Sequence, residues 1–137
     1  MKKNLATVTA AVGFGIGLAL SGSVTASAAV TPAHVGDVCT VGNNCAGSAS
    51  FVHDGDHLYV WDNASDGHSV VAQYMRSDSS NQWNQAWNHS GAGTSIDHNM
   101  DIPESGWIKY QVCLGEYGSQ SVIDSTCSPW GTIEDAG

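Results

Sequence analysis

The segment 62–71, DNASDGHSVV, gathers two carboxylates, an amide, a glycine and a histidine ahead of an apolar run. Such residues could bind calcium, because Asp62 and Asp66 would take positions one and five of an EF-hand-type loop. Two other ligand positions do not fit. Position three is Ala64, and position twelve, which needs a bidentate Glu, is Gln73. The segment is therefore an incomplete calcium loop.

A strand-to-strand turn explains the same segment better. Asn, Asp, Ser and Gly favour tight reversals, and the segment lies between two runs that alternate as strands do. We predict that Asp62 and Asp66 accept backbone hydrogen bonds and that Gly67 has a conformation costly for other residues. Calcium held by Asp62, Asp66 and backbone carbonyls remains the alternative.

The other polar residues do not form a catalytic or metal-binding pattern. His53 and His57 flank one predicted hairpin turn, but no third ligand accompanies them and no H-E-x-x-H motif is present. The sequence also has no G-x-S-x-G motif and no P-loop. Carboxylate pairs such as Asp97 and Asp101 are expected by chance in so acidic a chain. We predict that the protein is not an enzyme and holds no metal or cofactor.

The aromatic residues are more informative, since the chain has five tryptophans and four tyrosines. In the segment 81–91, NQWNQAWNHSG, strand alternation puts Trp83, Gln85 and Trp87 on one face. Two rings about 13 Å apart, with an amide between them, suit the apolar faces of sugars or pockets on a protein partner. The alternative is that both tryptophans fill the core.

The elements that carry these residues are predicted to be strands. Turn residues recur every eight to twelve positions, as in all-β domains. The run WIKYQVCL is the clearest strand, with Ile108, Tyr110, Val112 and Leu114 on one face. We predict a small antiparallel β-sandwich of about seven strands with immunoglobulin-like proportions, including a hairpin at a two-residue Asp54–Gly55 loop. The alternating runs are 48–53, 57–61, 69–76, 82–88, 94–102, 107–114 and 122–127.

Four cysteines allow three pairings. Their spacing favours one bridge between Cys39 and Cys45 and another between Cys113 and Cys127, because the two pairs lie at opposite ends of the domain. Zinc is not expected, since neither spacing matches a zinc motif. Two disulfides predict an oxidising compartment.

Residues 1–29 are predicted to be a secretory signal peptide. Lys2 and Lys3 precede an uncharged stretch, and Ala26-Ser27-Ala28 supplies a small-residue cleavage site. A membrane anchor is the alternative, but the stretch is rich in Gly, Ala, Ser and Thr and is followed by no charged stop. We therefore expect a secreted, extracellular product with no membrane association after cleavage.

The remaining residues, 30–137, suffice for one domain. They hold all 13 acidic residues but only Arg76 and Lys109 as basic ones, so their formal charge is −11. Nucleic acids and anionic membranes are excluded as partners, because binding them depends on Lys and Arg. We expect a soluble monomer.

The sequence contains several short motifs of turn and disulfide residues: Asp62-Asn63, Asp66-Gly67-His68-Ser69, Trp87-Asn88 with Gly91, Cys113-Leu114-Gly115-Glu116, and Cys127. Together they resemble a group of small secreted proteins of filamentous actinobacteria, which have no established activity. The motifs are turn and disulfide residues, so the resemblance implies an all-β fold with two disulfides. A looser similarity is to secreted actinobacterial α-amylase inhibitors, although their Trp-Arg-Tyr triplet is absent.

These observations predict a secreted, non-enzymatic binding module whose ligand is a carbohydrate or an extracellular protein. Trp83, Gln85 and Trp87 are the predicted binding residues. The alternative is a proteinaceous inhibitor of a secreted hydrolase, which would present the loop 115–121, GEYGSQS. Exposure of Trp83 and Trp87 compared with Tyr117 should discriminate between the two.

Overall fold

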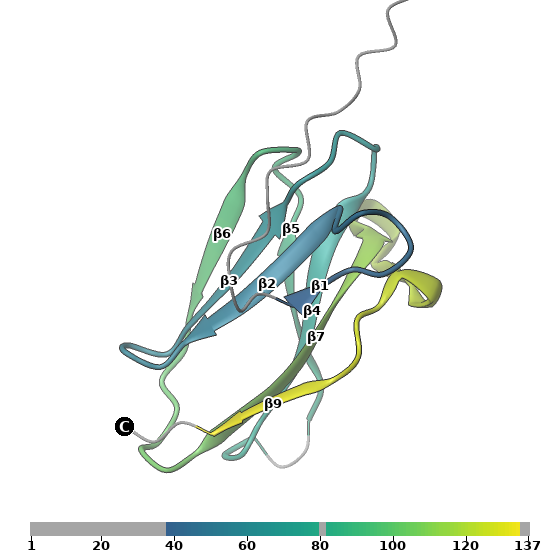
Figure 1. Ribbon diagram of the computed structural model, residues 1–137. Coiled ribbons are helices and arrows are strands. Elements are labelled where there is room, and N and C mark those ends of the chain that lie inside the picture. The colour runs from purple at the N-terminus through teal and green to yellow at the C-terminus, as the bar shows by residue number, and fades with distance from the viewer. Residues whose placement is uncertain (1–37, 80–81, 135–137) are drawn as a thin grey trace, which may run out of the picture.

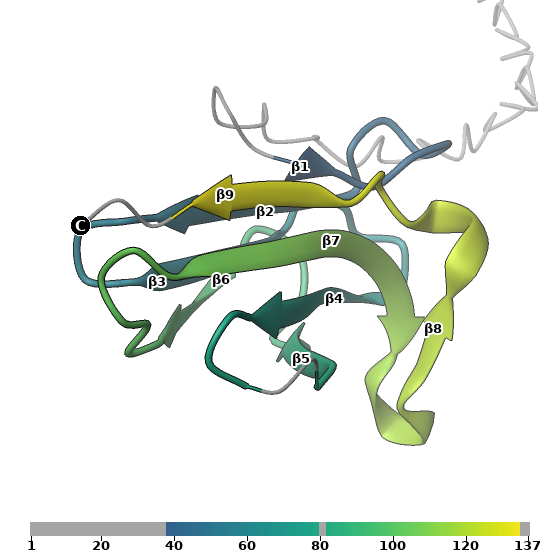
Figure 2. The same cartoon turned by 90° about the horizontal axis from the view of Figure 1, so that it is seen from below.

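The computed structural model describes residues 38–79 and 82–134, and these ranges fold into short antiparallel strands. Two sheets pack face to face as a β-sandwich (Figure 1, Figure 2). Two short 3₁₀-helices, η1 (Tyr117–Ser119) and η2 (Asp124–Thr126), lie late in the chain. The strands are β1 (Val38–Cys39), β2 (Gly47–Val52), β3 (His57–Asp62), β4 (Ser69–Arg76), β5 (Asn84–Asn88), β6 (Ser95–Asn99), β7 (Trp107–Glu116), β8 (Ser121–Ile123) and β9 (Gly131–Glu134).

The first sheet has the strand order β1-β2-β3-β6. The second has the order β5-β4-β7, with both β8 and β9 paired to the remaining edge of β7. In the lettering used for immunoglobulin domains, β2, β3 and β6 correspond to strands A, B and E of one sheet. In the other sheet, β5, β4, β7 and β8 correspond to strands C′, C, F and G. This is the pairing of an immunoglobulin-type sandwich, to which β1 and β9 are additions at the edges.

The predicted all-β sandwich is confirmed, and residues 38–79 and 82–134 contain nine strands in place of about seven. The two additional strands, β1 and β9, have two and four residues, which is too short for alternation to be recognised. The predicted strand 122–127 is wrong in its second half, because β8 ends at Ile123 and η2 follows.

The predicted hairpin between β2 and β3 is confirmed, but its turn is longer than expected. Val52 pairs with His57, so the turn has four residues, 53–56, and not the two-residue Asp54–Gly55 loop. Gly55 and Asp56 both have positive φ, at 86° and 56°. Asp56 tolerates this left-handed conformation better than most residues do, which lets the turn extend beyond the glycine.

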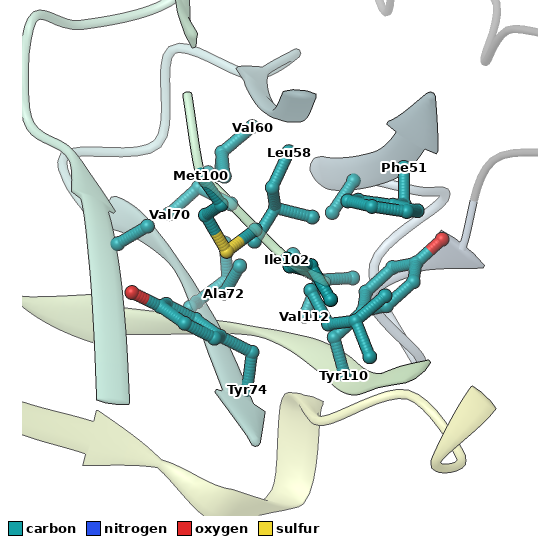
Figure 3. Packing of buried hydrophobic residues seen from close by; sticks show 14 of the residues in the cluster. Phe51, Leu58, Val60, Val70, Ala72, Tyr74, Met100, Ile102, Tyr110 and Val112 are labelled. Atoms are coloured by element: carbon teal, nitrogen blue, oxygen red, sulfur yellow. The ribbon is translucent and has the colours of Figure 1, made fainter. Parts of the chain in front are cut away.

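The core lies between the sheets and is drawn largely from β3, β4 and β7 (Figure 3). The predicted inward face of β7 is confirmed, since Ile108, Tyr110, Val112 and Leu114 are all buried. Leu58 on β3 is buried as well, on the opposite side of the core. Each fully buried side chain of this size stabilises the fold by about 1.5–3 kcal/mol.

Both predicted disulfides are present. Cys39 pairs with Cys45 and Cys113 pairs with Cys127, with Cα–Cα distances of 4.9 and 4.1 Å. The first closes the loop between β1 and β2, and the second ties β7 to the segment between η2 and β9. Paired cysteines fit an oxidising, extracellular-type compartment.

The predicted signal peptide, 1–29, lies outside the described residues. Within residues 38–79 and 82–134, no helix is long and apolar enough to cross a membrane.

Side chains cover the edge of β7 between β8 and β9. The hydroxyl oxygen of Thr126 accepts a hydrogen bond from the Leu114 N–H at 2.8 Å. The hydroxyl oxygen of Ser128 accepts one from the Val112 N–H at 3.0 Å. The Cys113–Cys127 bridge fastens the same segment. β7 is therefore fixed on both sides, which makes it a rigid support for its outward-facing side chains.

Candidate ligand-binding face

The three residues predicted to bind a ligand lie on the outer face of the second sheet. β5 turns Ala86 and Asn88 into the core, where they are 4% and 0% exposed. Gln85 and Trp87 therefore face outward, and Trp83, just before the strand, is 54% exposed. The alternative that Trp83 and Trp87 fill the core is wrong.

A row of three glutamines crosses this face. Gln73 on β4 pairs directly with Gln85 on β5 and with Gln111 on β7. The Gln111 Nε2 donates a hydrogen bond to the Gln73 Oε1 at 2.7 Å. Among the described residues, Nε2 of Gln73, Nε2 of Gln85 and Oε1 of Gln111 have no hydrogen-bond partner. Three polar atoms are thus available to a ligand in one line.

Trp87 flanks the row on one side, two residues along β5 from Gln85. Its Nε1 donates to the Gln85 Oε1 at 3.0 Å. Its six-membered ring covers Gly115, where an added Cβ would lie 2.8 Å from the ring. Tyr117 meets Trp87 edge to face at 5.9 Å between ring centroids, and His89 stacks on Tyr117 at 3.9 Å. Trp87, Tyr117 and His89 form one continuous aromatic cluster.

A second aromatic pair flanks the row on its other side. The ring centroids of Trp83 and Trp130 are 4.5 Å apart, with the planes inclined by 41°. The Lys109 Nζ lies 5.7 Å from the centroid of the Trp130 ring, within cation–π range. Trp83 precedes β5 and Trp130 precedes β9, so this pair spans β4 and β7, which lie between those strands. The glutamine row is therefore bounded by rings on both sides.

Sequence reasoning missed most of this face. Gln73, Gln111 and Lys109 are at outward positions of strands that were predicted correctly, so alternation could have marked them as candidates. Which of them stand side by side depends on strand register, which periodicity does not give. Trp130 lies beyond the last predicted strand, and its contact with Trp83 joins segments far apart in the sequence.

The outer face of the first sheet carries aromatic residues too. His57, Tyr59 and Trp61 alternate along β3, and adjacent ring centroids are 5.8 and 5.6 Å apart. The His57 Nδ1 is 2.7 Å from the Asp97 carboxylate, and its Nε2 is 3.3 Å from the Asn99 amide. Both ring nitrogens of His57 are occupied, so this row offers a ligand fewer polar groups than the glutamine row does.

The segment 62–71 forms the predicted turn. The Asp62 Oδ1 accepts a hydrogen bond from the Ala64 N–H at 3.2 Å, and the Asp66 Oδ1 accepts one from the His68 N–H at 3.0 Å. Gly67 has a φ of 82°. Both parts of the turn prediction are confirmed. Within the described ranges, no group of three or more His, Cys, Asp or Glu side chains could hold a metal ion.

Burial dominates the electrostatics of Asp62. Loss of solvent raises the pKa of its carboxyl above the usual value of 3.8, the Ala64 N–H opposes this, and the neighbouring Asp66 charge raises the pKa further. The carboxylate is therefore less stable here than in water.

Asn88 fixes the end of β5 against the rest of the sandwich. Its Nδ2 donates to the carbonyl oxygens of Val60 and Thr94 at 3.1 and 2.9 Å. Its Oδ1 accepts from the Ser90 N–H and the Thr94 hydroxyl at 3.2 and 3.1 Å. These four bonds join both sheets and the β5–β6 loop, so they help to hold the adjacent Trp87 in place.

Comparisons with known proteins add no relative. The chain matches no protein-family model. Searches of curated proteins and of solved structures also find no match. The resemblance to small secreted actinobacterial proteins therefore stays a prediction.

Proposed function

We propose that the protein is a secreted, non-enzymatic binding module that binds carbohydrate on the outer face of its second sheet. The supporting observation is the glutamine row of Gln73, Gln85 and Gln111, with unused amide groups, between two aromatic clusters. Sugar rings have apolar faces that stack on tryptophan and hydroxyl groups that pair with amides, so both features match one ligand class. The predicted signal peptide and the two disulfides are consistent with export.

Inhibition of a secreted hydrolase is the second candidate, and the loop 115–121 favours it in one respect. The Gln120 Nε2 donates to the Tyr117 carbonyl oxygen at 2.6 Å, and Gln120 has a positive φ of 54°, so the loop is braced internally. However, the Tyr117 ring packs against His89 and Trp87, although it is 42% exposed. The ring belongs to the aromatic face rather than to a projecting loop.

A glycan array on the disulfide-bonded protein, followed by titration with the best ligand, tests the proposal. Trp83→Ala and Gln73→Ala should each weaken binding about tenfold or more, because they remove a stacking ring and a central amide. Tyr59→Ala, on the outer face of the other sheet, is the matched control and should leave affinity within about twofold.

Two outcomes contradict the proposal. If Tyr59→Ala abolishes binding and Trp83→Ala does not, the ligand binds the first sheet. If no glycan binds and Tyr117→Ala relieves inhibition of a secreted hydrolase, the second candidate is correct.

A further inference from the structure

A pocket of about 280 Å³ opens at the end of the sandwich where the β3–β4 and β5–β6 loops meet. Asp62, Ser65 and His68 line one side, and His89 and Ala92 line the other. Its volume is near the lower limit for small-molecule sites, so it fits a ligand of about one sugar ring or an amino alcohol.

Asp62 is the buried polar group of this pocket. Its side chain is on the inward face of β3, and the residue is only 2% exposed. One carboxylate oxygen accepts the Ala64 N–H. Among the described residues, none donates a hydrogen bond to the other oxygen, Oδ2. Oδ2 is not itself fully enclosed, so a ligand in the pocket can reach this oxygen and supply a donor.

In the described part of the chain, no basic residue balances the charges around Asp62. Arg76 is bonded to Asp78 at 2.7 Å, and Lys109 lies over Trp130. His68, which lines the pocket, is paired through Nδ1 with Glu116 at 2.6 Å. The neighbouring Asp66 adds negative charge, which contributes to the raised pKa of the Asp62 carboxyl.

We propose that this pocket binds the protonated primary amine of a small ligand, with Asp62 Oδ2 accepting a hydrogen bond from the ammonium group. A hydroxyl group could also donate to Oδ2, but only a cation makes a charge-assisted hydrogen bond to the Asp62 carboxylate and offsets its negative charge. Calcium fits less well, because both carboxylates already accept a backbone N–H and the lining includes imidazoles and an alanine methyl group.

The inference does not rest on the carbohydrate proposal. The pocket is formed by loops at the end of the sandwich, whereas the glutamine row crosses the middle of the second sheet. His89 is the residue that links the two regions, since it lines the pocket and stacks on Tyr117. Trp83→Ala should therefore leave amine binding unchanged. A negative result for amine binding in the pocket would not contradict carbohydrate binding on the sheet, and the reverse also holds.

The test compares D-glucosamine with D-glucose, which differ in an ammonium and a hydroxyl group at one carbon. Both are titrated into the disulfide-bonded protein while backbone amide signals are followed by NMR. Glucosamine should give saturable shifts in residues 62–69 and 89–92. Glucose should bind roughly tenfold to a hundredfold more weakly, because its hydrogen bond to Oδ2 lacks the ligand charge.

Two variants test whether the charge of Asp62 is the one that binds glucosamine. Asp62→Asn keeps an oxygen for the Ala64 N–H but removes the charge, so glucosamine should bind roughly tenfold to a hundredfold more weakly. Asp66→Asn, the control, removes a charge that does not line the pocket and should change affinity less than about threefold.

Two results with the unmodified protein would each overturn the proposal. One is equal affinity for glucosamine and glucose, and the other is the absence of saturable amide shifts with glucosamine. An Asp62→Asn variant that binds glucosamine normally overturns it too. Displacement of glucosamine by low calcium concentrations would assign the pocket to a metal ion instead.

Discussion

Asn88 is a fully buried side chain whose removal would leave several backbone groups without partners. Asn88→Ala removes the donors to the Val60 and Thr94 carbonyl oxygens. We expect the free energy of unfolding to fall by roughly 2–4 kcal/mol, measured by urea denaturation. Asn84→Ala is the control, because Asn84 donates one exposed hydrogen bond to Gln82 and its loss should cost no more than about 0.5 kcal/mol. Similar losses in both variants would contradict this role for Asn88.

His98 makes stability depend on pH. Its Nε2 is 2.7 Å from the Tyr74 hydroxyl. Burial lowers the pKa of His98 below its usual 6.5, the Arg76 charge lowers it further, and Asp97 partly opposes both. The unfolded chain therefore takes up this proton more readily than the folded protein does. The contribution of His98 to stability is full above pH 6.5 and is lost as the pH falls from there through the folded-state pKa.

His98→Gln keeps a neutral polar side chain and should remove this component. We expect the unfolding free energy of the unmodified protein to decline relative to that of His98→Gln between about pH 7.5 and about pH 5. Urea denaturation at several pH values measures the difference. His89→Gln, at an exposed position, should retain the decline. Parallel pH profiles for the unmodified protein and His98→Gln would show that His98 is not responsible.

At the scale of strands, alternation predicts which way a side chain faces but not what it stands beside. The two faces of β7 and the outward positions of Trp83, Gln85 and Trp87 follow from the twofold period of an extended backbone. The alignment of Gln73 with Gln85 and Gln111 depends on register, which is set by the whole sheet. Spacing sufficed for the disulfides because their partners are near in sequence.

In the loops, too, local features could be predicted from the sequence, whereas contacts between distant segments could not. The turn at Asp62 and Asp66 was predictable, because Asx hydrogen bonds and a glycine with positive φ are local features. The pocket was not, since its other side comes from the β5–β6 loop, which reaches it only through the folding of the sandwich.

Gly115 on β7 leaves the space that the Trp87 ring occupies. A methyl group there would lie 2.7 Å from the Ser121 carbonyl oxygen as well as 2.8 Å from the ring. We expect Gly115→Ala to cost about 1–3 kcal/mol of stability and to shift tryptophan fluorescence, because the ring must move. The matched control is Gly118→Ala, where a methyl group would meet no atom within 4 Å. Unchanged fluorescence in Gly115→Ala would contradict the packing described for Trp87.

Across the whole molecule, the β3–β4, β5–β6 and β7–β8 connections gather at one end of the sandwich (Figure 1). In immunoglobulin-type sandwiches, loops at the ends of the two sheets are common binding positions. The pocket lies among these loops, whereas the glutamine row lies on the second sheet. The protein thus has two candidate sites of different kinds, one uncharged and one acidic.

The two sites should respond differently to salt. Residues 30–137 carry a formal charge of −11, which attracts a cationic ligand over a distance that salt shortens. Between about 0.05 M and about 0.5 M sodium chloride, binding of a neutral glycan should change less than about twofold, whereas glucosamine binding should weaken measurably. Titration calorimetry at several salt concentrations measures both. Glycan binding that falls steeply with salt would indicate a charge-driven contact.

The two tryptophans of the binding face differ in how freely they could change during evolution. Trp87 is half-buried over Gly115 and stands beside Val71, which is 0% exposed although it is not part of the hydrophobic cluster between the sheets. Replacing Trp87 would expose that valine to solvent and lower the stability of the fold, so selection should remove such variants. Trp83 is more than half exposed, so its replacement carries a smaller folding penalty. Homologous chains that acquire new ligands should therefore keep the Trp87 end constant and diversify at Trp83.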